Sequence, residues 1–314
     1  MKPCGNGRLS LAGWTGIIVA ILASLMAARG NAQTLEIAEP ETQMLETLRL
    51  ERAGDVSGRD VVFIPGLATP GEVWDGTIAA LGERVDAHVV SLAGFGDVPA
   101  VPRGEAGVVG SAVSDLTAWL AAEGLEDAVL VGHSMGAQIA LQVAAASPGR
   151  VSAVVVVDSA PFFARLFNPA ITVDQAAAYA AGASAQMAAA PREQFLAFSR
   201  QGLPVQSISP EGQAQVMGWM EQADQSVVSA AMGEVMGTDY SPVLPTVAVP
   251  VTVLFAWSEG SPMSAEQLES VYANQYSDLP SVVLERFDGS RHFIMLDQPD
   301  AFRAMLADII AQDR

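Results

Sequence analysis

Residues 127–146 read DAVLVGHSMGAQIALQVAAA and carry the strongest structural signal in the chain. Residues 127–131 are mostly apolar, as in a buried strand, whereas 135–146 has the length and the Ala, Leu and Val content of a helix. Between them, residues 132–136 (GHSMG) match G-x-S-x-G. A serine on a tight strand-to-helix turn has a strained backbone, and the flanking glycines leave space for the strand and the helix. The stretch therefore predicts that Ser134 occupies such a turn.

Apolar runs bounded by turn residues recur along the chain and alternate with helical stretches. We expect strands at residues 47–52, 61–65, 88–92, 128–131, 153–157, 251–256 and 282–287, the first of them at an edge. We expect helices near residues 72–82, 107–123, 135–146, 264–276 and 299–312. Runs that are apolar on both faces are typical of a buried, mostly parallel sheet. The order predicts an α/β fold with a mostly parallel, doubly wound sheet.

The alternation stops between residues 161 and 245. This segment has Ala- and Gln-rich helical stretches, several prolines and no strand pattern, and it is too long for a loop. We therefore predict a signal peptide over 1–32, a first part of the core over 33–160, a helical lid or cap over 161–245, and a second part of the core over 246–314.

The first 32 residues have the pattern of an export signal. Lys2 and Arg8 precede the apolar run 14–28, and residues 30–32 (GNA) supply the small side chains that a signal peptidase reads. We expect cleavage near Ala32 and export to the periplasm or the medium, with no stable membrane insertion afterwards. An uncleaved N-terminal membrane anchor is the alternative. Cleavage would remove three basic residues and no acidic residue, leaving 13 basic against 35 acidic residues.

Composition excludes several kinds of chemistry. The 314 residues include 16 Lys+Arg against 35 Asp+Glu, a formal net charge of -19, and 50% are hydrophobic. Cys4 is the single cysteine, which excludes an intramolecular disulfide and a cysteine-based metal site. Lys2 is the single lysine, which excludes a Schiff-base lysine and a Walker lysine. The acidity argues against nucleic acid as a partner. We expect no cofactor, no metal and a small-molecule substrate; the sequence does not indicate an oligomeric state.

Two loop motifs make the chain resemble the α/β-hydrolase family over residues 47–312. Residues 63–67 (FIPGL) end a strand where the family carries a His-Gly-x oxyanion loop, with Pro65 in place of the His. Residues 92–96 (LAGFG) are similar to the family's D-x-x-G-x-G stretch, with Ser91 where Asp is usual.

Two later stretches extend the resemblance in the same order. Residues 239–250 are similar to the family's return from the lid, and residues 291–293 (RHF) to its histidine loop. The ordered set resembles a serine esterase or lipase-like member of the family, of the exported bacterial type. The resemblance implies a helical lid and a triad in the chain order Ser, Asp or Glu, His.

The general base follows by elimination among three histidines. His88 begins an apolar strand and is expected to be a packed or edge residue. His133 precedes Ser134 where the family often has His, so its side chain should point away from the nucleophile. His292 remains, in the loop after the last predicted strand. A neutral imidazole there can take the hydroxyl proton and return it to the leaving group.

Two carboxylates qualify as the triad acid. Glu259 follows the strand 251–256, the usual position in the family, although Asp is more frequent there. Asp158 ends the preceding strand, a corner where some members carry the acid. A rigid strand end supports an imidazole better than a Gly-Ser-Pro loop does, which favours Asp158 and keeps Glu259 as the alternative.

Further site residues follow from the same alignment of motifs. The family implies an oxyanion hole formed by the backbone N–H groups of Leu67 and Met135. Apolar side chains from the helical segment and from the loop after Asp158 are candidate substrate contacts: Phe162, Phe163, Met217 and Met220. Packing of the segment against the core is the competing explanation for the methionines.

These features predict a serine hydrolase that cleaves a carboxylic ester through an acyl-enzyme on Ser134. The absence of an Arg cluster and the acidic balance favour a neutral ester with an apolar acyl or alcohol part. Amide, C–C bond or perhydrolase chemistry on the same triad is the first alternative. A non-catalytic binding protein on the same fold is the second, since a fold alone does not establish an activity.

Overall fold

The protein is described here by a computed structural model, which covers Met1 and residues 41–312. These residues, apart from Met1, belong to one compact unit, Pro40–Arg314. The predicted signal peptide, beyond Met1, lies outside the described residues. Within the described part, no helix is both long enough and apolar enough to cross a membrane.

An eight-stranded sheet forms the centre of this unit, with the strand order β1-β2-β4-β3-β5-β6-β7-β8. β1 and β2 pair antiparallel, as do β2 and β4, and all later neighbours pair parallel. The strands are β1 (Thr42–Met44), β2 (Leu48–Gly54), β3 (Arg59–Ile64), β4 (Val85–Leu92), β5 (Ala128–His133), β6 (Val151–Val157), β7 (Val251–Trp257) and β8 (Val282–Asp288). The mostly parallel sheet confirms the predicted fold class. One detail differs. The strand expected at residues 47–52 is β2, and it does not lie at the edge of the sheet, because β1 pairs with its outer side.

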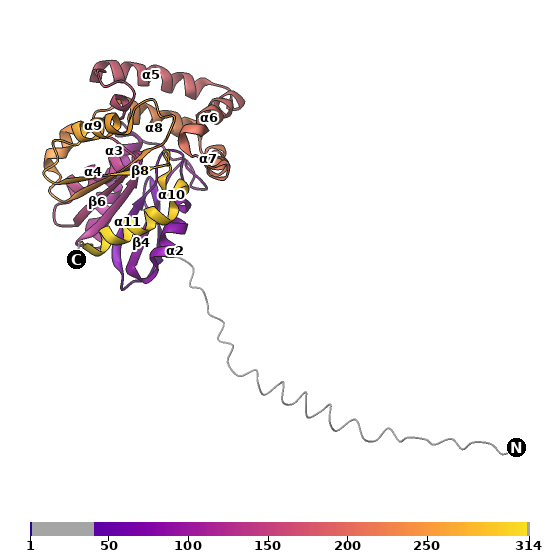
Figure 1. The fold of residues 1–314 in the computed structure, drawn as a ribbon, viewed down its shortest axis with the longest axis vertical. Coiled ribbons are helices and arrows are strands. Elements are labelled where there is room, and N and C mark those ends of the chain that lie inside the picture. Colours follow the sequence, from indigo (N-terminus) through magenta and orange to yellow (C-terminus); the bar gives the residue numbers. More distant parts are fainter. Residues whose placement is uncertain (2–40, 313–314) are drawn as a thin grey trace. The chain divides into compact units, whose positions relative to one another are not determined.

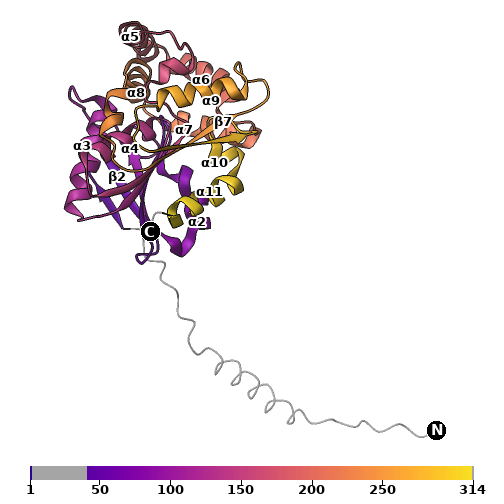
Figure 2. The ribbon, with the colours of Figure 1, turned by 60° about the vertical axis from the view of Figure 1, so that its left-hand side comes forward.

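Helices cover both faces of the sheet. The α-helices are α2 (Asp75–Leu81), α3 (Gly107–Ala122), α4 (Met135–Ala146), α5 (Val173–Ala189), α6 (Arg192–Gln206), α7 (Pro210–Gln222), α8 (Gln225–Gly237), α9 (Ala265–Gln275), α10 (Ile294–Asp297) and α11 (Pro299–Gln312). Short 3₁₀ turns are η1 (Gly71–Trp74), η2 (Gly82–Arg84), η3 (Phe163–Leu166) and η4 (Ser241–Thr246). Figure 2 shows α3 and α4 on one face and α2 and α11 on the other.

Alternating side chains of the central strands build two separate cores. Val62 and Ile64 of β3 belong to the core under α3 and α4, whereas Val61 and Phe63 belong to the core under α2 and α11. This period of two is what a strand buried on both faces produces. It accounts for the continuous apolar runs from which the strands were predicted.

The turn from β5 to α4 requires glycine, which has no side chain, at positions 132 and 136. A Cβ atom on Gly136 would lie 2.5 Å from the carbonyl oxygen of Pro65, and one on Gly132 would lie 2.5 Å from the Cα of Ala137. Both contacts are with backbone that cannot rotate away. The two glycines therefore let α4 approach the end of β3 and hold the turn at Ser134 in place.

Four helices, α5 to α8, connect β6 to β7, and residues 161–245, all of them described, contain no strand. They gather at one end of the unit, coloured rose to orange in Figure 1. α5 packs along α8, and α6 along α7. We call residues 161–245 the helical segment. Its role as a lid, like the exact segment boundaries, stays a prediction.

Substitution of Gly136 by Ala tests the close packing at this turn. We expect Gly136→Ala to lower the free energy of unfolding by about 1–3 kcal/mol, because the added methyl group overpacks a backbone contact. The matched control is Gly182→Ala in α5, where a Cβ meets no atom within 4 Å and removal of a helical glycine stabilises by up to ~1 kcal/mol. Urea unfolding measures both. Equal stabilities for the two variants would contradict the packing argument.

Candidate active site

Ser134 lies at the carboxyl end of β5 in a strained conformation. Its φ of 54° is in the region that favours glycine, and its side chain is nearly buried. The Ser134 amide donates to the Val157 carbonyl at 2.9 Å, which extends the β5–β6 pairing through the turn. The hydroxyl lines a cavity at the carboxyl ends of the parallel strands. The sequence prediction of a serine at a strand-to-helix corner is confirmed.

The loop after β3 lies directly against this serine. A Cβ on Gly66 would come within 3.1 Å of the Ser134 Cβ, and Leu67 lines the same cavity. Met135, the first residue of α4, is fully buried. Neither the Leu67 nor the Met135 amide donates to an acceptor among residues 41–312. Their N–H groups are thus available to an oxygen atom near Ser134, and the positive end of the α4 dipole points the same way.

His292 and Asp158 form the closest polar pair in the cavity. His292 Nδ1 lies 2.7 Å from Asp158 Oδ2, and both side chains are largely buried. Asp158 ends β6, and His292 lies in the loop after β8. Because Nδ1 faces a carboxylate, it carries the proton, and Nε2 keeps the lone pair that can accept another. Ser134, His292 and Asp158 all line the one cavity.

Asp158 is itself held by the next strand and by a helix. Its amide donates to the Leu254 carbonyl at 2.7 Å, and its Oδ1 accepts from the Ala256 amide at 2.9 Å. The Tyr272 hydroxyl, on α9, donates to the same Oδ1 at 3.3 Å. Burial, and then the charge of Asp158, raises the pKa of Tyr272 well above 10, so it remains a neutral donor. No sequence signal pointed to Tyr272, since it is one of several apolar positions on its helix.

Glu259, the alternative acid, has different surroundings. It is exposed, and it does not line the cavity. Its contact with the histidine loop is made by its backbone, whose carbonyl accepts from Arg291 Nη2 at 3.5 Å. The structure therefore brings Asp158, and not Glu259, against His292.

His133 does not point away as predicted. Its Nε2 lies 3.0 Å from the His292 carbonyl oxygen, and its ring centroid is 4.6 Å from that of His292. Phe293 packs on the same ring with a centroid distance of 4.6 Å. The side chain is fully buried, and burial lowers the pKa of His133 well below 6.5, so the imidazole is neutral. The sequence motif placed His133 next to the nucleophile. The direction of its side chain is determined by a contact with the loop after β8, which the motif does not include.

The cavity has a volume of about 520 Å³ and is mostly apolar. Phe163, Met217 and Met220 line it as predicted. Phe162 does not, because it turns into a small buried cluster with Ala164. Met232 and Met236, which share the helical spacing of Met217 and Met220 and were expected as possible pocket walls, line the cavity too. Further apolar walls were missed from the sequence: Met187, Phe195, Phe198 and Met263. The segment's Met and Phe content was the available signal.

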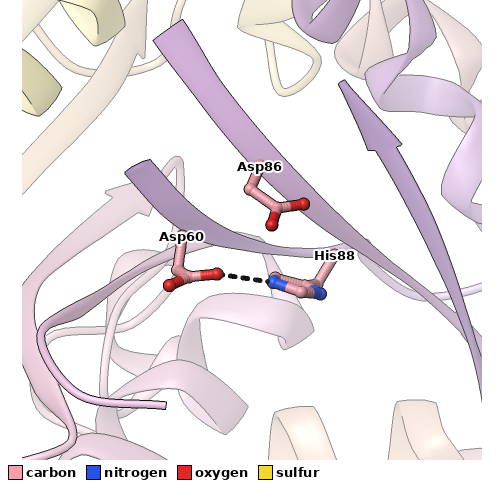
Figure 3. A group of neighbouring side chains, drawn as sticks. All are labelled: Asp60, Asp86 and His88. Carbon is pink, nitrogen blue, oxygen red and sulfur yellow. Dashed lines mark hydrogen bonds and ion pairs between the residues drawn. The ribbon is translucent and has the colours of Figure 1, made fainter. Parts of the chain in front are cut away.

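Figure 3 shows a second group of titratable side chains, Asp60 near the start of β3 and Asp86 and His88 in the first half of β4. Asp60, Asp86 and His88 have ligand atoms within 4.8 Å of one another, a spacing that could suit a metal ion. Arg52, however, binds both oxygens of Asp86, at 2.9 and 2.5 Å, and His88 Nε2 lies 2.9 Å from Asp60 Oδ1. The guanidinium already supplies the positive charge. His88 also packs against Trp119, and the Arg52–Asp86 ion pair and the His88–Asp60 hydrogen bond join β2, β3 and β4.

Curated relatives match the chain over different lengths. A pimeloyl-[acyl-carrier protein] methyl ester esterase from Pectobacterium carotovorum is 26% identical over 77% of this chain and 91% of its own length. One from Aeromonas hydrophila is 35% identical over 37% of this chain, which spans 43% of that relative. An N-formylmaleamate deformylase from Pseudomonas putida is 33% identical over 32% of this chain and 37% of its own length.

Solved structures and a family profile show which fold family the chain is similar to. A thermophilic esterase from Thermogutta terrifontis superposes with a TM-score of 0.69 at 19% identity, over 87% of this chain and 99% of that chain. An aryl esterase from Burkholderia cenocepacia, itself described as putative in function, gives 0.69 at 18% identity over 87% and 99%. The profile described as "Alpha/beta hydrolase family" matches residues 61–305. With the elbow, the sheet order and this match in agreement, the chain belongs to the alpha/beta hydrolase family.

Proposed function

We propose that this chain is an exported serine hydrolase that cleaves a carboxylic ester with an apolar acyl or alcohol part. The observation that carries the proposal is the position of Ser134 at the elbow, in the same cavity as the His292–Asp158 pair. A nucleophile, a general base and an acid that orients the base are the groups that acyl transfer uses, and here they come from the ends of β5 and β6 and the loop after β8. The relatives named as esterases support ester bonds as the class of substrate.

In the proposed reaction, His292 Nε2 accepts the Ser134 proton while Oγ attacks the ester carbonyl carbon. The carbonyl oxygen becomes an oxyanion, for which the Leu67 and Met135 amides are the proposed donors. The tetrahedral intermediate collapses with loss of the alcohol, which takes its proton from His292. Water then repeats the sequence on the acyl-enzyme and releases the acid. Asp158 keeps the imidazole oriented and stabilises its charged form, without taking the proton itself.

The lining of the cavity supports an apolar substrate group. Apolar side chains predominate, many of them methionine or phenylalanine, and Arg291 is the one arginine or lysine that lines the cavity among the described residues. Thioether side chains adapt to differently shaped apolar groups. Phe163, Met217 and Met220 are therefore proposed substrate contacts, together with the methionines of α8. A small-molecule ester fits these walls without any cofactor or metal.

A p-nitrophenyl ester series tests the activity. We expect hydrolysis to rise roughly 10- to 100-fold in kcat/KM from acetate to medium chains, because each buried CH₂ contributes up to ~0.8 kcal/mol. Ser134→Ala should lose roughly 10⁴-fold or more and should not react with a fluorophosphonate. Amide and methyl ester panels compare the alternative bond types. Folded wild type that neither hydrolyses any ester nor reacts with the probe would exclude the serine hydrolase proposal.

Paired acid variants test the triad assignment. Asp158→Asn should lower kcat by roughly 10³–10⁴-fold, because an amide no longer holds the tautomer in which Nδ1 carries the proton. Glu259→Gln should leave kcat near that of wild type, because the exposed Glu259 side chain lies outside the cavity. Steady-state kinetics on one ester, with thermal unfolding as the folding control, separates the two. Loss of activity in Glu259→Gln alone would make Glu259 the acid.

Export rests on the pattern of residues 1–32 and has its own test. We expect full-length chain expressed in a Gram-negative host to appear outside the cytoplasm with Gln33 as its first residue, because residues 30–32 match a signal peptidase site. Intact mass and N-terminal sequencing measure this. A membrane-bound chain that retains Met1 would instead support the N-terminal anchor.

A further inference from the structure

We propose that His133 is a positioning residue, which fixes the backbone of His292 so that the imidazole faces both Asp158 and Ser134. This inference rests on the proposed function, because it assigns His133 a role in the same acyl transfer. The motif around the nucleophile requires glycines and a serine, whereas it leaves the chemistry of position 133 open. The contacts of the His133 side chain therefore carry the argument.

The first contact is a hydrogen bond across 159 residues of sequence. His133 Nε2 lies 3.0 Å from the carbonyl oxygen of His292, so the side chain before the nucleophile holds the backbone of the base. A carbonyl accepts only, which means that Nε2 carries the proton. Burial keeps His133 neutral, with its pKa well below 6.5. The donor is therefore present without adding a positive charge beside the imidazolium that forms at His292.

The loop before His292 is anchored by the Gly289 amide, which donates to the Trp257 carbonyl at 2.8 Å, and by the Arg291 amide, which donates to Asp297 Oδ2 at 2.8 Å. The His292 amide reaches the Val205 carbonyl at 3.5 Å, a long contact, and the Phe293 amide reaches the Gln206 carbonyl at 2.9 Å. Both acceptors belong to α6 of the helical segment. Of the two bonds to the His292 backbone, the one from His133 comes from the sheet, because His133 is the last residue of β5. The His292 imidazole is held separately, by Asp158.

The same imidazole also touches the loop proposed to hold the oxyanion. A Cβ on Gly66 would lie 2.8 Å from His133 Nδ1, so the ring and that loop are in direct contact. Nδ1 is buried without a hydrogen-bond partner in the described part of the chain. An unpaired buried nitrogen is costly, so the bond from Nε2 to the His292 carbonyl is the one polar contact that an imidazole gains here over an apolar ring. One ring therefore contacts the nucleophile turn, the base loop and the oxyanion loop.

Amide substitutions separate the hydrogen bond from the rest of the side chain. The amide nitrogen of glutamine can occupy the place of His Nε2, whereas that of asparagine reaches only the place of Nδ1. We expect His133→Gln to keep kcat within about threefold of wild type, since the bond to the His292 carbonyl can form. His133→Asn should lower kcat by about tenfold or more with little change in KM, because the base is misplaced in the transition state.

His133→Phe serves as a second control, because it keeps an aromatic ring against Phe293 without a donor. We expect it to lose kcat like His133→Asn. In wild type and His133→Gln, proton NMR should give one sharp far-downfield resonance from the His292–Asp158 bond, and that resonance should broaden in the Asn and Phe variants. Thermal unfolding establishes that all three variants are folded.

Two results would overturn the positioning role. Equal kcat for the Gln, Asn and Phe variants would show that the donor is not used, and a loss confined to KM would make His133 a pocket residue. Ser134→Ala distinguishes these from failure of the proposed function. If Ser134→Ala keeps full activity, the acyl-enzyme is wrong; if it is inactive while all His133 variants match wild type, only the positioning inference falls.

Discussion

The backbone of Gly136 packs so tightly against the end of β3 that no side chain fits between them, and the geometry of the site depends on this contact. It brings α4 against the loop that carries Leu67, so that the helix N-terminus and the loop amides face one space. It also forces the chain to turn within one residue of β5. Ser134 accepts the resulting φ of 54°, a conformation that disfavours any side chain with a Cβ.

A second strained residue repeats the arrangement on the neighbouring strand. Asp158 has a φ of 46° and directly follows β6, as Ser134 follows β5. Each amide continues the pairing of its strand, to Val157 and Leu254 respectively. Such conformations cost of order 1–3 kcal/mol each and persist only where the surroundings determine them. The sheet thus stabilises two polar side chains at a fixed separation, and the loops and helices outside the sheet contribute His292 and the apolar walls.

The limits of prediction from sequence follow from the same architecture. Strands β3 to β8 were predicted to within about three residues, because burial on both faces gives β3 to β7 apolar runs, and β8, at the edge, still begins with three apolar residues. Ser134 was predicted because its motif is local. Contacts between residues at different strand ends were harder to predict. Asp158 was preferred over Glu259 as the triad acid because a strand end is more rigid than a loop. The predicted direction of the His133 side chain, away from the nucleophile, was wrong. Phe162 and Phe163 are adjacent, yet they face a core cluster and the cavity respectively. Such choices depend on how the loops after the strands pack against one another, which no local sequence motif records.

Sulfur atoms make up much of the wall that a substrate would touch. Six methionines line the cavity, namely Met187, Met217, Met220, Met232, Met236 and Met263. An oxidant such as hydrogen peroxide converts a thioether into a polar sulfoxide. The single cysteine, Cys4, lies within the proposed signal peptide, so the exported protein would have no thiol to consume such an oxidant first. Each sulfoxide formed would make the apolar cavity wall more polar and more hydrated. The affinity of the cavity for an apolar substrate group would therefore depend on the redox conditions around the protein.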